Sequence, residues 1–208
     1  MYVTLHARLR ALLRAASQPN NDSKGLQHTI LRMAVQTSGA TLISEAQIRE
    51  RIRSLAAEID AGYPPGEDVH LVAVLKGAFI FLADLARAMT RPVTLDFMAV
   101  SSYAKGTTSS GEVRLIKDLD YGLEGRNVII VEDIVDTGLT LHYLQEILRA
   151  RSPKTLRTAC LLSKPSRRQI EVKVEYIGFT IEDKFVVGYG LDFAEQHRHL
   201  PEIAVLQS

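Results

Sequence analysis

The sequence predicts an α/β protein built on a mainly parallel sheet. Short apolar, β-branched runs alternate along the chain with segments of helical periodicity, and this alternation is typical of strand–helix–strand units. The 208 residues are 46% hydrophobic and 24% charged, as in an ordinary globular domain with an appendage. This composition excludes wholesale disorder, collagen-like repeats and coiled coils. No apolar run approaches the ~18 residues that a membrane span needs.

Residues 1–40 differ from the rest of the chain. They contain five basic residues and one acidic residue, although the whole chain carries a net charge of only +1. Residues 17–23 are polar and typical of a loop. We expect a flexible N-terminal extension with one short helix, followed by a single domain over residues 41–208. An organellar transit peptide and a translation start at Met33 remain alternatives.

The single cysteine and the net charge bear on compartment and partners. Cys160 lies in an apolar run and cannot form an internal disulfide, which predicts a buried thiol in a reducing compartment. We therefore expect a cytoplasmic protein. A net charge of +1 gives no global field that would favour nucleic acid or a membrane as a partner.

The first half of the domain shows regular elements. A capping-box pattern begins at Ser44 and predicts a helix that ends near Gly62, ahead of two prolines. A buried strand is expected over residues 69–75, a helix over 77–89 and a second strand over 93–101. The length of this unit favours parallel pairing of its strands.

The second half of the domain again alternates strands and helices, after a polar segment without apolar periodicity. Residues 101–110 are small, polar and without apolar periodicity, which indicates a mobile loop. We expect a helix over residues 139–150 and a basic loop over 164–168. Strands are expected over residues 112–117, 127–131, 155–163, 173–177 and 185–187.

The segment over residues 128–140 carries the chemistry. Its apolar strand delivers Glu132 and Asp133 to a carboxyl end, where open α/β sheets bind ligands. A tight turn then opens into a helix, whose free N–H groups and threonine hydroxyls would cradle a phosphate. The turn comprises Asp136, Thr137 and Gly138, and the candidate binding residues continue with Leu139 and Thr140 at the start of the helix. Carboxylates beside a phosphate cradle suit a ligand with a phosphate at one end and hydroxyls or a cation beside it, such as a ribose 5-phosphate.

Other interpretations of this segment explain less of it. Each acid alone could be a helix cap or a solvated loop residue, but the whole arrangement on so apolar a strand is poorly explained in that way. A response-regulator receiver also pairs acids at a strand end, yet it leaves the phosphate-type turn unexplained. Neither a Gly-x-Gly-x-x-Gly nor a Gly-Lys-Ser/Thr motif is present, which disfavours dinucleotide and P-loop sites.

The segment resembles the phosphoribosyl-diphosphate signature of type I phosphoribosyltransferases. Residues 43–206 resemble the hypoxanthine/guanine branch of that family in its bacterial form. The resemblance implies a parallel-sheet core with a small hood and a mobile lid loop. It places further binding residues at Lys76 and Gly77 in a loop with a non-proline cis peptide, Ser102 and Tyr103 in the lid, Lys164, Phe185 and Val186 at the purine, and Asp192 and Arg198 at the pyrophosphate.

The resemblance also implies the reaction. The substrates would be 5-phosphoribosyl diphosphate and a 6-oxopurine, with Asp136 as general base. Mg²⁺ would be the cofactor, with Glu132, Asp133 and Asp192 as its ligands. The family implies a homodimer or homotetramer. Two alternatives remain: a sibling enzyme for another base such as xanthine, and a regulatory protein that keeps the fold.

Overall fold

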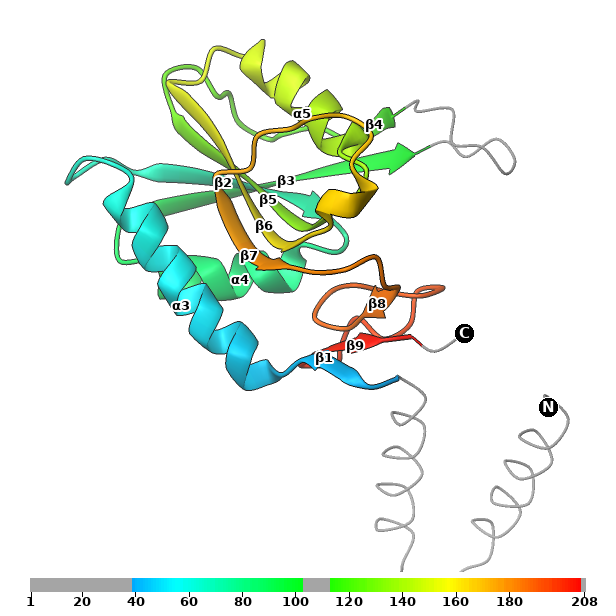
Figure 1. Cartoon of the computed structure of the whole chain (residues 1–208). Coiled ribbons are helices and arrows are strands. Elements are labelled where there is room, and N and C mark those ends of the chain that lie inside the picture. The colour runs from blue at the N-terminus through cyan, green and yellow to red at the C-terminus, as the bar shows by residue number, and fades with distance from the viewer. Residues whose placement is uncertain (1–38, 103–112, 207–208) are drawn as a thin grey trace, which may run out of the picture. The chain divides into compact units, whose positions relative to one another are not determined.

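The computed structural model describes residues 39–102 and 113–206, and its centre is a six-stranded sheet (Figure 1). The strand order is β4-β3-β2-β5-β6-β7, with all neighbours parallel except the antiparallel pair β3–β4. A second, three-stranded antiparallel sheet has the order β1-β9-β8. The predicted α/β class with a mainly parallel sheet and a small hood is therefore confirmed.

The elements follow one another in a largely alternating order. The strands of the central sheet are β2 (Val69–Leu75), β3 (Val93–Ser102), β4 (Val113–Lys117), β5 (Asn127–Val135), β6 (Thr155–Ser163) and β7 (Tyr176–Thr180). The hood consists of β1 (Thr41–Ile43), β8 (Val186–Val187) and β9 (Ile203–Val205). The helices are α3 (Glu45–Ala61), α4 (Phe79–Ala88), α5 (Leu139–Arg149) and the short 3₁₀ helix η1 (Pro165–Arg167).

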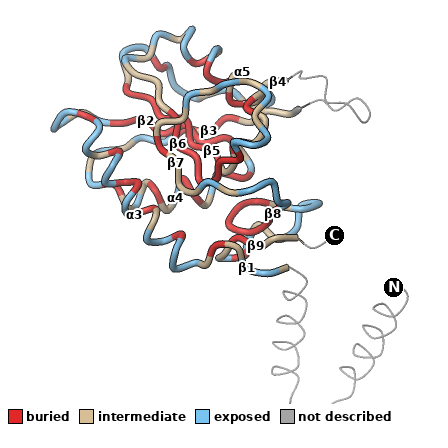
Figure 2. Tube along the Cα trace, in the orientation of Figure 1, coloured by how far each residue is buried: buried red, intermediate tan, exposed pale blue. Residues whose placement is uncertain are grey.

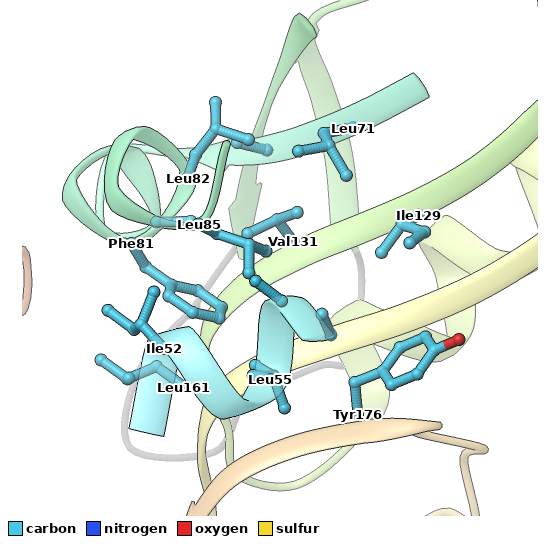
Figure 3. Packing of buried hydrophobic residues seen from close by; sticks show 14 of the residues in the cluster. Ile52, Leu55, Leu71, Phe81, Leu82, Leu85, Ile129, Val131, Leu161 and Tyr176 are labelled. Atoms are coloured by element: carbon cyan, nitrogen blue, oxygen red, sulfur yellow. The ribbon is translucent and has the colours of Figure 1, made fainter. Parts of the chain in front are cut away.

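Helices cover the two faces of the central sheet (Figures 1 and 2). The apolar side chains along β2 and β5 alternate between two hydrophobic clusters, so both faces of these strands are buried. Ile129 and Val131 face the helices α3 and α4 (Figure 3), whereas Val128 and Ile130 face the side of α5. The hood contributes Ile203 to the first cluster, which joins it to the body.

The capping box at the start of α3 is present as predicted. The backbone N–H of Gln47 donates to the Ser44 hydroxyl at 3.4 Å, and the Ser44 N–H donates to Gln47 Oε1 at 2.9 Å. Ile48, Ile52 and Leu55 fall on the buried face of the helix. In the described part of the chain, no helix is long and apolar enough to cross a membrane.

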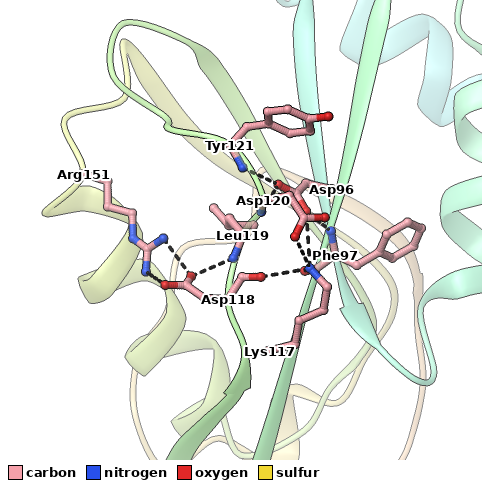
Figure 4. A network of polar contacts seen from close by, with 8 residues as sticks. All are labelled: Asp96, Phe97, Lys117, Asp118, Leu119, Asp120, Tyr121 and Arg151. Atoms are coloured by element: carbon pink, nitrogen blue, oxygen red, sulfur yellow. Dashed lines mark hydrogen bonds and ion pairs between the residues drawn. The ribbon is translucent and has the colours of Figure 1, made fainter.

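A polar network fixes the edge of the sheet (Figure 4). The buried carboxylate of Asp96 in β3 accepts the backbone N–H groups of Asp120 and Tyr121, at 2.8 and 3.2 Å. The Lys117 ammonium lies 3.8 Å from the same carboxylate and donates to the Phe97 carbonyl. Because these bonds join β3, β4 and the following turn, they set the position from which both strands extend towards residues 103–112.

Several predicted boundaries are wrong. The strand expected to end at Val131 continues to Val135, so the acidic pair lies inside β5 and not in a turn. The strand expected over residues 173–177 begins only at Tyr176 and runs through Gly178. A Cβ at position 178 would lie 2.4 Å from the Leu161 carbonyl oxygen, so this glycine permits the close approach of β7 to β6. Strands β1 and β9 were not predicted.

Candidate functional site

Most of the predicted site residues lie at the carboxyl edge of the parallel sheet. Lys76 and Gly77 follow β2, the acidic pair and the phosphate turn belong to the end of β5, and Lys164 follows β6. Segment 185–198, which contains β8, adds Phe185, Val186, Asp192 and Arg198. A cavity of about 210 Å³ is lined by nine residues of segment 132–141, including both acids, the turn over residues 136–138, and Thr140 and Leu141 at the start of α5.

Glu132 and Asp133 are an electrostatically unfavourable pair. Burial raises the pKa of Glu132 well above its ordinary value, and the charge of Asp133 raises it further. Burial also raises the pKa of Asp133 to about 6, against the opposing effects of hydrogen bonds and of Arg198. Two desolvated carboxylates without a bound cation are costly, so this end of the cavity favours hydroxyl donors or a metal ion.

The charge cost of Asp133 predicts a pH dependence of stability. A carboxyl whose pKa is higher in the folded than in the unfolded chain makes the free energy of unfolding fall as pH rises from about 4 through 6. Asp133→Asn removes this penalty, so without ligand or divalent cation the variant should be more stable than the parent at pH 7, by about 1–3 kcal/mol. The advantage should vanish near pH 4, as measured by urea unfolding across this range.

In a matched control, the substitution should change the free energy of unfolding in the opposite direction. The Arg151 guanidinium lowers the pKa of Asp118, so Asp118→Asn should lose stability relative to the parent above pH 4. A stability difference for Asp133→Asn that does not change with pH would contradict the electrostatic interpretation of the pair.

Gly77 brings the loop after β2 against Asp133. The peptide bond between Leu75 and Lys76 is cis, as the resemblance implied. A Cβ at position 77 would lie 1.5 Å from Asp133 Oδ2, so only glycine lets the two approach. The backbone of this loop is therefore adjacent to the acidic pair.

The phosphate turn begins α5 with a left-handed residue. Gly138 has φ +88°, a conformation that glycine adopts without strain. The Thr137 carbonyl accepts the N–H groups of Gln169 and Ile170, at 2.9 and 3.3 Å, which ties the turn to the next loop. The first N–H groups of a helix have no intrahelical acceptor, and the first turn of α5 lines the cavity, as a phosphate site requires.

Asp136 is held by two arginines that the sequence did not single out. Its carboxylate lies 3.3 Å from Arg167 Nε. The Arg168 guanidinium donates to the carbonyl oxygens of Val135 and Asp136, and to the Ser163 hydroxyl at 3.0 Å. The basic composition of loop 164–168 was the only sequence signal, and it does not distinguish which arginine turns back to the strand end.

Lys164 is buried, with 6% of its surface exposed. Its ammonium lies 3.7 Å from Asp183 Oδ1, and Asp183 also contacts Arg167. Lys164 is therefore not solvated, although it begins a basic loop. A chain of opposite charges joins Lys164 to Asp136 through Asp183 and Arg167.

The predicted purine platform is an exposed aromatic pair. Phe185 is 54% exposed and meets Phe193 edge to face, with ring centroids 5.7 Å apart. Phe185 is thus not a core residue, and its ring is accessible for stacking. Val186 differs, because its side chain is buried in the core and leaves only its backbone for a ligand.

A second charged cluster joins the hood to the loop after β2. Arg198 Nη2 lies 2.7 Å from Asp192 Oδ1, and its Nη1 donates to the Gly190 carbonyl. Lys76 Nζ donates to Glu195 Oε2 at 2.8 Å. Asp192 and Arg198 lie close enough to Asp133 to affect its pKa, so the structure brings the predicted pyrophosphate and ribose residues together. Sequence reasoning missed Glu195.

The lid residues are described only in part. Ser102 is the last described residue of β3, and Tyr103 lies outside the described residues.

A larger cavity, of about 710 Å³, lies between α3, α4 and residues 189–201 and includes none of the predicted site residues.

The residues fit a magnesium ion that is held jointly with a substrate. Within residues 39–102 and 113–206, no group of three or more metal-ligating side chains forms a ready-made cage. Mg²⁺ is commonly held by one or two carboxylates together with substrate phosphates and water. The buried pair with its raised pKa values supplies hard oxygens that lack a cation, which suits such an ion.

The comparisons with known proteins all match this chain to phosphoribosyltransferases. A family model described as "Phosphoribosyl transferase domain" matches residues 40–194. A hypoxanthine-guanine phosphoribosyltransferase of Aquifex aeolicus is 46% identical over 166 residues, which cover 80% of this chain and 93% of the relative. A hypoxanthine phosphoribosyltransferase of Escherichia coli is 48% identical over 163 residues, covering 78% and 92%.

Solved structures show the same likeness. A hypoxanthine-guanine phosphoribosyltransferase of Bacillus anthracis superposes with a TM-score of 0.78 at 47% identity, covering 82% of this chain and 99% of that one. A hypoxanthine phosphoribosyltransferase of Staphylococcus aureus gives a TM-score of 0.80 at 39% identity, covering 84% and 95%.

Proposed function

The chain belongs to the phosphoribosyltransferase family and to its hypoxanthine-guanine branch, and on this premise we propose that it is a purine-salvage enzyme. It converts hypoxanthine or guanine and 5-phosphoribosyl diphosphate to the nucleoside monophosphate and pyrophosphate. The observation that carries this proposal is the cavity in which a buried acidic pair adjoins a phosphate turn. That pairing matches the two ends of a ribose 5-phosphate.

The reaction exchanges one bond at the anomeric carbon. The bond from this carbon to the diphosphate oxygen breaks, the bond to purine N9 forms, and the N7 proton passes to the Asp136 carboxylate. The sugar passes through an oxocarbenium-like state, as in other glycosyl chemistry. Glu132 and Asp133 hold the ribose hydroxyls and place negative charge beside this cation.

The residues of the hood and of the loop after β2 hold the leaving group. Arg198 donates to the diphosphate, for which its planar fork is suited. The backbone at Gly77 and the Lys76 ammonium lie beside it. Asp192, with Glu132 and Asp133 on the ribose side, would hold Mg²⁺. When bound, the ion neutralises charge that develops on the diphosphate oxygens.

The purine lies between Phe185 and Lys164 in this proposal. The exposed Phe185 ring stacks on the base, worth about 1–3 kcal/mol. The buried Lys164 ammonium donates to the O6 atom of a 6-oxopurine. Ser102 and Tyr103 would close over the reacting centre and exclude water, which would otherwise hydrolyse the donor.

Pyrophosphate release with a panel of bases tests the proposal. Hypoxanthine and guanine should support turnover with 5-phosphoribosyl diphosphate and Mg²⁺, and adenine should not. Turnover with xanthine in preference to both would favour a sibling enzyme. Donor binding without turnover on any base would favour a regulatory protein.

Compartment and assembly complete the proposal. A cytoplasmic location is supported by the buried, unpaired Cys160, whose burial raises the pKa of its thiol to about 12. A homodimer or homotetramer follows from the family resemblance, and sedimentation velocity of the purified chain tests it. The net charge of +1 gives no reason to expect nucleic acid or a membrane as a partner.

Deleting residues 1–32, so that the chain begins at Met33, should leave turnover and melting temperature nearly unchanged. The family match begins at residue 40, and every proposed site residue follows Ala73. Steady-state kinetics and thermal unfolding of both chains measure this. A large loss of either property would show that residues 1–32 are part of the functional domain.

A further inference from the structure

Glu195 contacts two cations of the proposed pyrophosphate site. Its Oε2 accepts a hydrogen bond from Lys76 Nζ at 2.8 Å, and its Oε1 lies 3.4 Å from Arg198 Nη2. The Glu195 side chain is 67% exposed, so no packing forces it into this position. Lys76, and to a lesser degree Arg198, lower the pKa of Glu195, which keeps the carboxylate charged at neutral pH.

The backbone around Glu195 directs the side chain towards these cations. Ala194, Glu195 and His197 all have positive φ values, of 50°, 64° and 75°. Such values are uncommon for residues other than glycine. The Glu195 N–H donates to Asp192 Oδ2 at 2.8 Å, which fixes the loop to a second residue of the site. The loop is thus shaped to place a carboxylate between Lys76 and Arg198.

Arg198, one of the two cations that Glu195 contacts, is preorganised to bind an anion. Arg198 is held in place by the Gly190 carbonyl and by Asp192, so its guanidinium is fixed. Its Nε is buried and has no hydrogen-bond partner among the described residues. Buried donors are rarely left without an acceptor. Glu195 offers one carboxylate to a pair of groups that could bind a more highly charged anion.

We propose that Glu195 is a built-in competitor of the diphosphate, which occupies Lys76 and Arg198 when the leaving-group site is empty. The inference rests on the proposed function for the identity of the anion. Glu195 shields the two like charges from each other in the free protein and swings out when the donor binds. It returns as pyrophosphate leaves, so it weakens pyrophosphate binding and speeds product release.

The inference predicts that removing a charge strengthens binding. Glu195→Gln keeps the size of the side chain but no longer competes as an anion. Inorganic pyrophosphate, titrated calorimetrically with Mg²⁺ and again in its absence, should bind about three- to tenfold more tightly to this variant. The change equals about 0.7–1.4 kcal/mol at tenfold per 1.4 kcal/mol. Product inhibition by pyrophosphate should strengthen by the same factor.

A matched control separates competition from general electrostatics. Glu146 lies on α5, is similarly exposed and pairs with Arg149 at 3.0 Å. Glu146→Gln removes the same charge away from this cluster and should leave pyrophosphate affinity unchanged. Tightening in both variants to the same degree would show a long-range charge effect and overturn the inference.

The two proposals fail in different ways. Unchanged or weaker pyrophosphate binding by Glu195→Gln would overturn the competitor role, even if the parent transfers phosphoribosyl groups. Tighter binding by the variant would sustain the competitor role, even if no purine supported turnover and the proposed function were wrong. The melting temperature of Glu195→Gln should be near that of the parent, which shows that the binding comparison is made between two folded proteins.

Discussion

Asp136→Asn should lower kcat by about two to four orders of magnitude, which is the usual contribution of a positioned general base. The amide has nearly the same size and stays at the start of α5, where Arg168 holds the backbone carbonyl of residue 136. It cannot accept the purine N7 proton. The KM for the donor should change far less. Steady-state kinetics with hypoxanthine measure both constants.

Two further variants separate proton transfer from the loss of an ion pair. Asp136 lies 3.3 Å from Arg167, so its replacement also frees a guanidinium. Arg167→Gln breaks the same contact and keeps the carboxylate, and its kcat should stay within about tenfold of the parent. Asp118→Asn removes an exposed carboxylate elsewhere and should leave kcat unchanged. Equal losses in the Asp136 and Arg167 variants, or parent-like turnover in Asp136→Asn, would remove Asp136 from the catalytic role.

Lys164 should decide which purine reacts. Its ammonium is buried, so a base without an acceptor opposite it leaves a desolvated charge without that partner. Adenine carries an amino group where hypoxanthine carries O6, so donor would face donor. Sites of this kind can reject the mismatched ligand by 10⁴–10⁵-fold. We expect negligible kcat/KM with adenine in the parent.

Lys164→Gln should lower kcat/KM for hypoxanthine and guanine while retaining donor binding. The control is Lys154→Gln, because Lys154 precedes β6 at its other end and pairs with Glu67 there. Measured with all three bases, the control should match the parent. Equal efficiency with adenine and hypoxanthine in the parent, or unchanged oxopurine efficiency in Lys164→Gln, would contradict this assignment.

The sequence allowed the central sheet to be predicted where strands are buried on both faces. The runs at residues 69–75 and 155–163 consist mostly of apolar and β-branched residues, and β2 and β6 have these bounds. The sequence indicated that Glu132 and Asp133 belong to the site, but it did not predict that they lie within a strand, because charged residues rarely continue a buried strand. In the structure Glu132 pairs with Cys160 and Ile134 with Leu162, so neighbouring strands extend β5 beyond its apolar run.

The parts that escaped prediction depend on long-range contacts. The hood strands β1 and β9 are three residues each and pair across most of the domain, so neither has a local pattern. The contacts of Arg168 and Glu195 are set by how loops fold back on strand ends. The resemblance supplied the positions of Lys164 and Arg198, but their burial and partners came only from the structure.

The contacts of Gly77 and Gly190 have a consequence for how movements pass through the site. A Cβ on Gly190 would lie 2.0 Å from the Gly77 carbonyl oxygen, just as one on Gly77 would lie 1.5 Å from Asp133. The backbone at Gly190 therefore packs directly on the backbone at Gly77, which in turn packs directly on the Asp133 carboxylate. We therefore expect a displacement of the backbone at Gly190 to shift the backbone at Gly77 and, through it, the Asp133 carboxylate.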